Sequence, residues 1–175
     1  MLAIIWIVQT RRKTGRRSSR KKPDGFYKCL DVSCRQCPYV EGGPGVRVVK
    51  EVTVSHTGEK IPIKGHITCQ SRNVIYEGHC NKEDRTCPNR DQYVGQTSKR
   101  AVDRFVSHRN TIKQQCHAQS TAPVAVHFRG PGHCLSNFVF TPFEKCYGSN
   151  QVRLGRESMY IQLFGGIENL LNKDL

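Results

Sequence analysis

Apolar and polar positions alternate between residues 46 and 63, in the first half of the chain. A period of two is typical of strands with one buried face, and Thr57-Gly58-Glu59 has the composition of a turn. The pattern therefore predicts two short strands joined by this turn. The segment is too short and too polar to bury a core unaided. Its alternating apolar residues are Val46, Val48, Val52, Val54, Ile61 and Ile63.

From residue 71 onward the pattern changes to longer apolar runs and helical spacing. Thr97 is the candidate N-cap of the first helix, and Gly165-Gly166 end the last one. This order of elements predicts an α+β fold, within the broad α/β class: a small three-stranded antiparallel sheet flanked by helices. The predicted strands span residues 73–77, 92–95 and 137–144, and the predicted helices span about 98–114, 121–128 and 154–164.

Composition divides the chain into three segments. Residues 1–24 form a basic tail that we expect to be disordered, and Pro23-Asp24-Gly25 marks its boundary as a turn. Residues 25–70 are expected to form a small, β-rich module stapled by zinc. Residues 71–175 are expected to form the second, α+β unit. The apolar stretch at residues 2–8 is too short to span a bilayer, so no membrane partner is expected.

The net charge is +14 and the pI is about 9.7, which favours a polyanionic partner. Cations are concentrated in the tail, where a run without acidic residues is typical of a nucleic-acid-binding arm or a nuclear-localisation signal. We therefore expect a nucleic acid as partner and the nucleus as location. The expected binding residues of the arm are Arg11, Arg12, Lys13, Arg16, Arg17, Arg20, Lys21 and Lys22.

The chain has nine cysteines. Their odd number, the basic tail and the lack of a secretory signal favour reduced thiols in an intracellular protein over a disulfide scaffold. Cys29-x4-Cys34-x2-Cys37 has the spacing of a tetrahedral zinc site. A fourth ligand must come from downstream: Cys69 is favoured, and His66 is the substitute. Incidental free thiols are the alternative interpretation.

The remaining cysteines are less informative. An extended strand between Cys69 and Cys80 would separate the two by roughly 30 Å. Cys80 and Cys87 are therefore expected to stay out of the first cluster, and either pair with each other or hold a second metal. Ordinary buried or surface thiols are expected at Cys116, Cys134 and Cys146.

Six polar side chains of the second unit suit the cleavage of a phosphodiester. A tyrosine can take or relay a proton, an arginine stabilises phosphate charge, and a carboxylate holds a divalent metal. Arg104 and His108 lie four residues apart, so they share one face of the predicted helix. The candidate residues are Tyr76, Tyr93, Arg104, His108, Glu157 and Asn172.

Several short strings follow one another in a fixed order along the chain. Those that carry the candidate chemistry are Val74-Ile75-Tyr76, Tyr93-Val94-Gly95-Gln96-Thr97, Arg104-x3-His108, Arg156-Glu157 and Leu170-Leu171-Asn172. Upstream lie Gly25-Phe26-Tyr27-Lys28-Cys29 and Cys34-Arg35-Gln36-Cys37-Pro38. In this order the strings resemble the GIY-YIG endonuclease domain, and most closely the version found in Penelope-like retroelements. The resemblance covers roughly residues 25 to 173.

The resemblance implies roles for the first four polar residues. Tyr76 would act as the general base or orient the attacking water, and Tyr93 would hold the nucleophile or the phosphate. Arg104 would stabilise the pentacovalent phosphate. His108 would assist proton transfer or hold Tyr76 in place.

The resemblance also implies a single-metal hydrolysis of DNA. Glu157 would be the sole protein ligand of one Mg²⁺ or Mn²⁺, and Asn172 would brace the metal side of the site. The chain departs from the family pattern at Val74, where the first tripeptide has glycine, and in the long loop between the two tyrosines.

The chain has no room for a reverse transcriptase. We therefore expect a fragment or a stand-alone relic of a retroelement, with the reverse transcriptase of the parent element as a candidate partner. Two further functions stay open at this point: a catalytically inactive module that binds zinc and DNA, and a structure-specific DNA repair nuclease.

Overall fold

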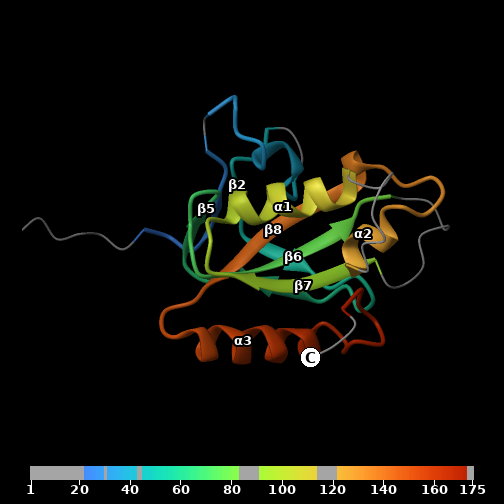
Figure 1. Cartoon of the computed structure of the whole chain (residues 1–175). Helices are drawn as coiled ribbons and strands as arrows, with labels where there is room; N and C mark the ends of the chain where they lie inside the picture. Colours follow the sequence, from blue (N-terminus) through green and yellow to red (C-terminus); the bar gives the residue numbers. More distant parts are fainter. Residues whose placement is uncertain (1–21, 30, 43–44, 83–90, 114–121, 173–175) are drawn as a thin grey trace, which may run out of the picture.

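A computed structural model gives the fold of residues 22–29, 31–42, 45–82, 91–113 and 122–172. It is an α+β protein with small sheets and helices, as the sequence predicts (Figure 1). All of the predicted basic arm except Lys22, which is exposed, lies outside the described residues, as do Cys87 and Cys116. No helix in the described part is long and apolar enough to cross a membrane.

The central sheet has β6 in the middle, with β7 and β8 antiparallel on either side. Pairing on both edges and packing on both faces leave the side chains of β6 almost entirely buried. The register sets Tyr76 opposite Gly95 on one side and Pro142 on the other. The three strands span Val74–Cys80 (β6), Gln92–Thr97 (β7) and Phe138–Lys145 (β8).

Two long helices cover opposite faces of this sheet (Figure 1). The helix α3 begins after Ser149, whose hydroxyl accepts a hydrogen bond from the Val152 N–H, and ends before Gly165 and Gly166, which both have positive φ. The short α2 starts at a proline, which suits the first turn of a helix. The helices span Ala101–Lys113 (α1), Pro123–His127 (α2) and Asn150–Leu163 (α3).

The segment before β6 forms two small sheets. In one, β1 pairs antiparallel with β2 and parallel with β5; in the other, β3 and β4 form an antiparallel hairpin. One hydrophobic core runs from Phe26 and Ile67 of this segment to Phe105 and Phe140 of the second unit. The short elements are β1 (Gly25–Tyr27), η1 (Cys37–Tyr39), β2 (Val48–Val49), β3 (Glu51–Thr53), β4 (Lys60–Pro62), β5 (His66–Thr68) and η3 (Leu135–Asn137).

Most predicted elements are confirmed, with shifted ends. The predicted N-cap of the first helix is wrong: Thr97 ends β7, its hydroxyl accepts from the Lys99 N–H, and α1 begins at Ala101. The reason is that the backbone of Thr97 still pairs with Val74 in the sheet. The parallel pair of β1 and β5 was not predicted from the sequence.

Candidate active site and metal-binding clusters

The Tyr76 hydroxyl is the centre of a polar group in the middle of the central sheet. Tyr76 is fully buried on β6. The Arg104 Nε–H donates to its oxygen at 2.8 Å, and the His108 Nε2 lies 2.9 Å from the same oxygen. Arg104 and His108 come from successive turns of α1, which lies over this face of the sheet (Figure 1). The structure thus brings three of the predicted residues into direct contact.

Tyr93 and Gly95 complete the group from β7. The rings of Tyr93 and Tyr76 are 6.2 Å apart, and the Tyr93 ring lies 5.8 Å from that of His108. A Cβ on Gly95 would lie 2.5 Å from the Tyr76 hydroxyl oxygen and 2.6 Å from Cε1 of Tyr93. Both phenols therefore depend on the missing side chain at Gly95. The sequence contains this glycine in its second tripeptide, but its steric role follows only from the strand register.

The protonation states of the group follow from burial. Burial raises the pKa of Tyr76 well above its usual value. Burial, with help from the Arg104 charge, lowers the pKa of His108 to about 3. At neutral pH the phenol is therefore protonated and the imidazole is neutral. Because Arg104 can only donate, the arrangement favours an O–H of Tyr76 that donates to the His108 Nε2.

Glu157 lies beside this group on α3 and is half-buried. Burial raises the pKa of its carboxyl, whereas the Gln96 backbone N–H and the charges of Arg104 and Arg153 lower it. The Glu157 charge in turn raises the pKa of both tyrosines, which places the carboxylate within electrostatic reach of the phenols. Glu157 is the one predicted site residue whose chemistry suits a divalent cation.

Asn172 has a different position from the other candidates. Its side-chain oxygen accepts the Val94 N–H at 3.0 Å and its amide donates to the Val94 carbonyl at 2.8 Å. The residue is buried and fixes the end of the described chain to β7. Arg156, which precedes Glu157 in the family-like string Arg156-Glu157, forms no hydrogen bond to Tyr76 or Tyr93 among those of the described residues. It forms a two-bonded ion pair with Glu144, which also accepts from Tyr160.

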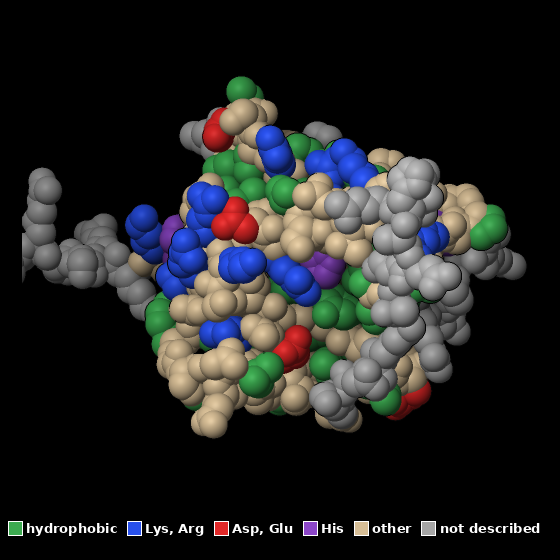
Figure 2. Space-filling model, viewed as in Figure 1, with side chains coloured by type: hydrophobic (Ala, Val, Ile, Leu, Met, Phe, Trp, Pro, Cys, Tyr) green, Lys and Arg blue, Asp and Glu red, His purple; other side chains and the backbone are tan. Residues whose placement is uncertain are grey.

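A groove of about 260 Å³ lies next to Arg104, between the start of α1 and the start of α3. Lysine and arginine side chains gather on this face of the molecule, over and beside α1 (Figure 2). We call this groove the α1/α3 groove. Its polar lining includes Ser98, Lys99, Arg104, Ser107, Asn150 and Arg153.

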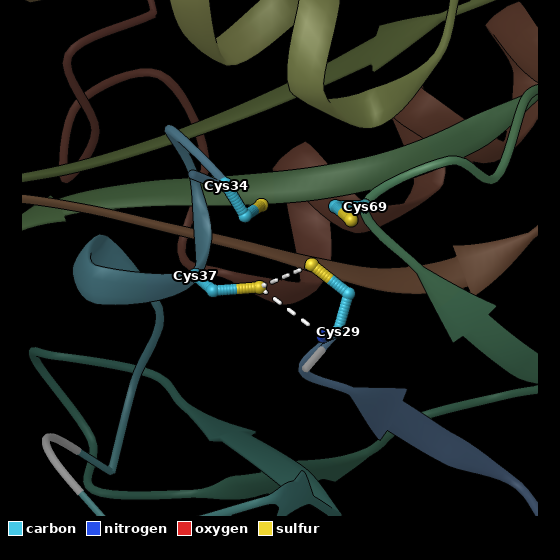
Figure 3. A group of neighbouring side chains, drawn as sticks. All are labelled: Cys29, Cys34, Cys37 and Cys69. Carbon is cyan, nitrogen blue, oxygen red and sulfur yellow. Dashed lines mark hydrogen bonds between the residues drawn. The ribbon is translucent and has the colours of Figure 1, made fainter. Parts of the chain in front are cut away.

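Four cysteines face one another near the first turn of α1. They are Cys29, Cys34, Cys37 and Cys69, and their sulfur atoms all lie within 4.8 Å of one another (Figure 3). Four thiols at this separation could hold a metal such as zinc in a tetrahedral site. Burial raises the pKa of Cys37 to about 12 and also raises that of Cys69, so a bound metal would displace protons from them.

The fourth member of this cluster is the favoured residue, Cys69, and not the substitute. His66 lies outside the cluster, and its ring packs on that of Tyr27 at 4.3 Å. His66 belongs to β5, whose pairing with β1 turns the imidazole toward Tyr27. The other predicted free thiols agree with the structure where it describes them, because Cys134 is exposed and Cys146 is buried, and both are free.

The cysteine cluster is joined to α1 through the backbone. The Val102 N–H donates to the Cys69 carbonyl, and the Ala101 N–H donates to the Ser71 carbonyl, both at 2.9 Å. These two carbonyls satisfy donors in the first turn of α1, which has no helical partner for them. The cluster therefore helps to fix the helix that carries Arg104 and His108.

A second group of metal-capable side chains lies at the far end of β6. Cys80, His127 and His133 offer ligand atoms within 4.8 Å of one another. The His133 Nδ1 lies 3.2 Å from the Pro131 carbonyl, and its Nε2 is buried without a hydrogen-bond partner. An Nδ1–H that donates to a carbonyl leaves Nε2 as a free lone pair, which is the state of a metal-binding imidazole.

The sequence predicts that Cys80 pairs with Cys87 or holds a second metal with it, and it does not predict the two histidines as partners of Cys80. Cys87 lies outside the described residues, so that pairing stays a prediction. A signal for the histidines was present: they flank Gly130-Pro131-Gly132, a turn that can bring two nearby imidazoles together.

Comparison with known proteins adds no further assignment. No protein-family model, no curated protein and no solved structure matches this chain significantly.

Proposed function

We propose that the chain is a metal-dependent DNA endonuclease of the GIY-YIG type, derived from a retroelement and active in the nucleus. One observation carries the proposal: the buried Tyr76 hydroxyl lies between the Arg104 Nε and the His108 Nε2, at 2.8 and 2.9 Å. A phenol held between a guanidinium and a neutral imidazole is suited to moving a proton beside an anionic substrate.

The proton path follows from the protonation states. An attacking water would give its proton to the Tyr76 oxygen as the Tyr76 proton passes to the His108 Nε2. The oxygen of that water would form the new bond to phosphorus, and the bond from phosphorus to the leaving oxygen of the sugar would break. Arg104 would stabilise the charge on the non-bridging oxygens. Tyr93, beside both rings, would orient the water or the phosphate.

Glu157 would hold one Mg²⁺ or Mn²⁺. Its half-buried carboxylate has a raised pKa, so a bound cation would offset the cost of burying its charge. Such an ion supplies Lewis acidity to the phosphate and lowers the pKa of bound water. The four-cysteine cluster would hold zinc in a structural role, because four thiols leave no coordination position for a substrate.

Plasmid nicking with Mg²⁺ or Mn²⁺ tests the proposal. We expect Tyr76→Phe and Glu157→Ala to lower the nicking rate by about 10²-fold or more, since each removes a group from the reaction centre. Tyr147→Phe and Glu59→Gln are matched controls at exposed positions, and both should nick like the wild type. Circular dichroism and thermal unfolding check that the variants fold.

One outcome would reject the enzyme proposal. If zinc-loaded wild-type protein binds DNA but nicks no faster than Glu157→Ala, the enzyme proposal fails and a DNA-binding module remains. If the protein does nick DNA, a panel of flaps, junctions and linear duplex would decide between a mobile-element nuclease and a structure-specific repair nuclease.

A further inference from the structure

We propose that the α1/α3 groove is a binding site for a second phosphate of the DNA strand, next to the phosphate that is cleaved. The groove is lined by Arg104, whose Nε–H already contacts the Tyr76 hydroxyl. The inference rests on the proposed function, because it assigns part of the same substrate to a neighbouring surface. It adds two residues, Arg153 and Lys99, to which the nuclease chemistry gives no role.

Arg153 is the first argument for an anion in this groove. It is 6% exposed, and its guanidinium donates only to neutral amide oxygens, those of Gln96, Asn73 and Asn150. In the part of the chain that the structure describes, no carboxylate pairs with it. Glu157, one turn further along α3, is close enough for the charge of Arg153 to lower its pKa, but the two form no direct ion pair. A buried cation without a direct ion pair is costly, so an anion in the groove would stabilise it.

Arg156, one turn further along α3, shows how an arginine in a folded protein is usually neutralised. Its guanidinium is neutralised by the buried carboxylate of Glu144 through two hydrogen bonds. The chain therefore pairs one arginine of α3 with an acid and holds the other with amides only. Amide acceptors fix the position of Arg153 and leave its charge available to the groove.

The backbone at Asn73 supports a built site. Asn73 is the one non-glycine residue with positive φ, at 55°, among the described residues. Asparagine tolerates this left-handed conformation, which costs most other residues about 1 kcal/mol or more. Its side-chain oxygen accepts from the Arg153 Nη1 at 3.2 Å. Asn73 thus helps to hold the cation at the groove.

The rim of the groove is positively charged, like Arg153 inside it. Lys99 is exposed, and the hydroxyls of Ser98 and Ser107 line the groove beside it. The acidic lining residue, Asp103, is already paired with Arg100 at 2.7 Å. Cations together with hydroxyl donors are typical of phosphate contacts that position a nucleic acid without reading its bases. A DNA strand is favoured because its phosphates repeat at about 3.4 Å of rise, so one strand can occupy both sites.

Binding can be measured without cleavage. The full-length chain is titrated into a fluorescein-labelled 30-bp duplex without Mg²⁺ or Mn²⁺, and anisotropy is followed at several salt concentrations. We expect Lys99→Gln to weaken binding about threefold to tenfold and to reduce the slope of log K against log salt by about 1. Lys99→Arg should restore both values. The control is Lys60→Gln, an exposed lysine of β4 outside the groove.

Arg153 gives the second arm of the test. Arg153→Gln should weaken binding at least as much as Lys99→Gln, and Arg153→Lys should give an intermediate value because it keeps the charge but loses the planar fork. If Arg153→Gln does not fold, the Lys99 variants decide alone. In the nicking assay Lys99→Gln should raise KM and leave kcat unchanged, since it removes a binding contact and no reacting group.

Two results would overturn the inference. In one, Lys99→Gln and Lys60→Gln weaken binding equally, which means that attraction is spread over the surface. In the other, Lys99→Gln binds like the wild type. A protein that never nicks DNA but loses affinity selectively in Lys99→Gln would keep the groove and reject the nuclease, so the two proposals can fail separately.

Discussion

The two ends of β6 carry two different groups of metal-capable side chains. At its start lies the four-cysteine cluster, which offers four candidate ligand atoms. At its end, Cys80 meets two imidazoles, and the described residues offer three candidate ligand atoms. The first group fixes the start of α1 through the Cys69 carbonyl, whereas the second joins β6 to α2 through His127. Tyr76 lies on the strand between them.

The two groups differ in the number of candidate ligands that the described residues offer. Four thiols fill a tetrahedral site and leave no position for solvent, but three ligands leave one position to another group. We therefore expect a tightly held ion at the start of β6 and a weaker one at its end. The predictions below test this contrast from the largest expected effect to the smallest.

Removal of a ligand at the start of β6 should have the largest effect. Cys34→Ser should lose one zinc per chain and a large part of the ~10 kcal/mol that a structural zinc site can contribute to folding. Urea unfolding and metal analysis measure the two losses, and nicking should fall with them because α1 carries Arg104 and His108. Cys134→Ser, at an exposed free thiol, is the matched control. Equal zinc content in Cys34→Ser and wild type would remove Cys34 from the site.

The proposed reaction centre, between the two ends of β6, should lose activity without any loss of zinc. Gly95→Ala would place a methyl group 2.5 Å from the Tyr76 hydroxyl oxygen, so the phenols must move. A displacement of about 1 Å can lower a rate by about 10²-fold. We expect that loss in nicking together with unchanged zinc content. Gly155→Ala, at a position with open space on α3, is the control. Full activity in Gly95→Ala would show that the close approach of the tyrosines is not needed.

Loss of a ligand at the end of β6 should have a smaller effect than Cys34→Ser. His133→Ala removes an imidazole from a three-ligand group, so we expect zinc affinity at this end to fall by about 10-fold or more while the four-cysteine cluster stays loaded. Competition with a chromophoric chelator resolves the two ions, and His56→Ala, at an exposed position, is the control. If a chelator removes both ions together in the wild type, the proposed difference between the ends is wrong.

A pH effect on stability should be the smallest. Burial, and then the charge of Glu77, raise the pKa of Glu41 to about 7. A raised folded-state pKa means that this stability is fully present below the usual glutamate pKa near 4.5 and is lost as the pH rises through 7. Glu41→Gln should reduce the pH dependence of the unfolding free energy between about pH 4.5 and 7. The reduction should be about 1 kcal/mol or less, because the group is partly exposed. An unchanged slope in Glu41→Gln would contradict the assignment.

His79, on β6, is a second group that acts in the same direction at higher pH. His79 is largely buried, which lowers its pKa, but the Glu77 carboxylate at 2.9 Å raises it to about 9 overall. Its contribution is fully present below the usual histidine pKa near 6.5 and is lost as the pH rises through 9. Urea unfolding of Glu41→Gln above pH 7 should therefore still show a decrease in stability.

Local pattern was enough to predict much of the fold and part of the proposed site. Helical spacing predicted that Arg104 and His108 share one face of α1, but their contact with Tyr76 was expected only from the resemblance to the GIY-YIG domain. The choice of Cys69 over Cys80 required only strand length. The Gly130-Pro131-Gly132 turn was a local signal that His127 and His133 lie close together, but their meeting with Cys80 depends on how α2 folds back onto the end of β6. The role of Arg153 depends on the register that sets Asn73 and Gln96 beside α3.

Asn172 has a consequence for the behaviour of the protein in solution. β7 is at the edge of its sheet, and an open edge can pair with a strand of another molecule. The Asn172 amide bonds both the N–H and the carbonyl of Val94, and the Leu171 N–H donates to the Gln92 carbonyl. This segment acts as a substitute for the missing neighbour strand. A chain shortened before residue 171 should therefore self-associate at concentrations where the full chain stays dispersed, which light scattering would detect.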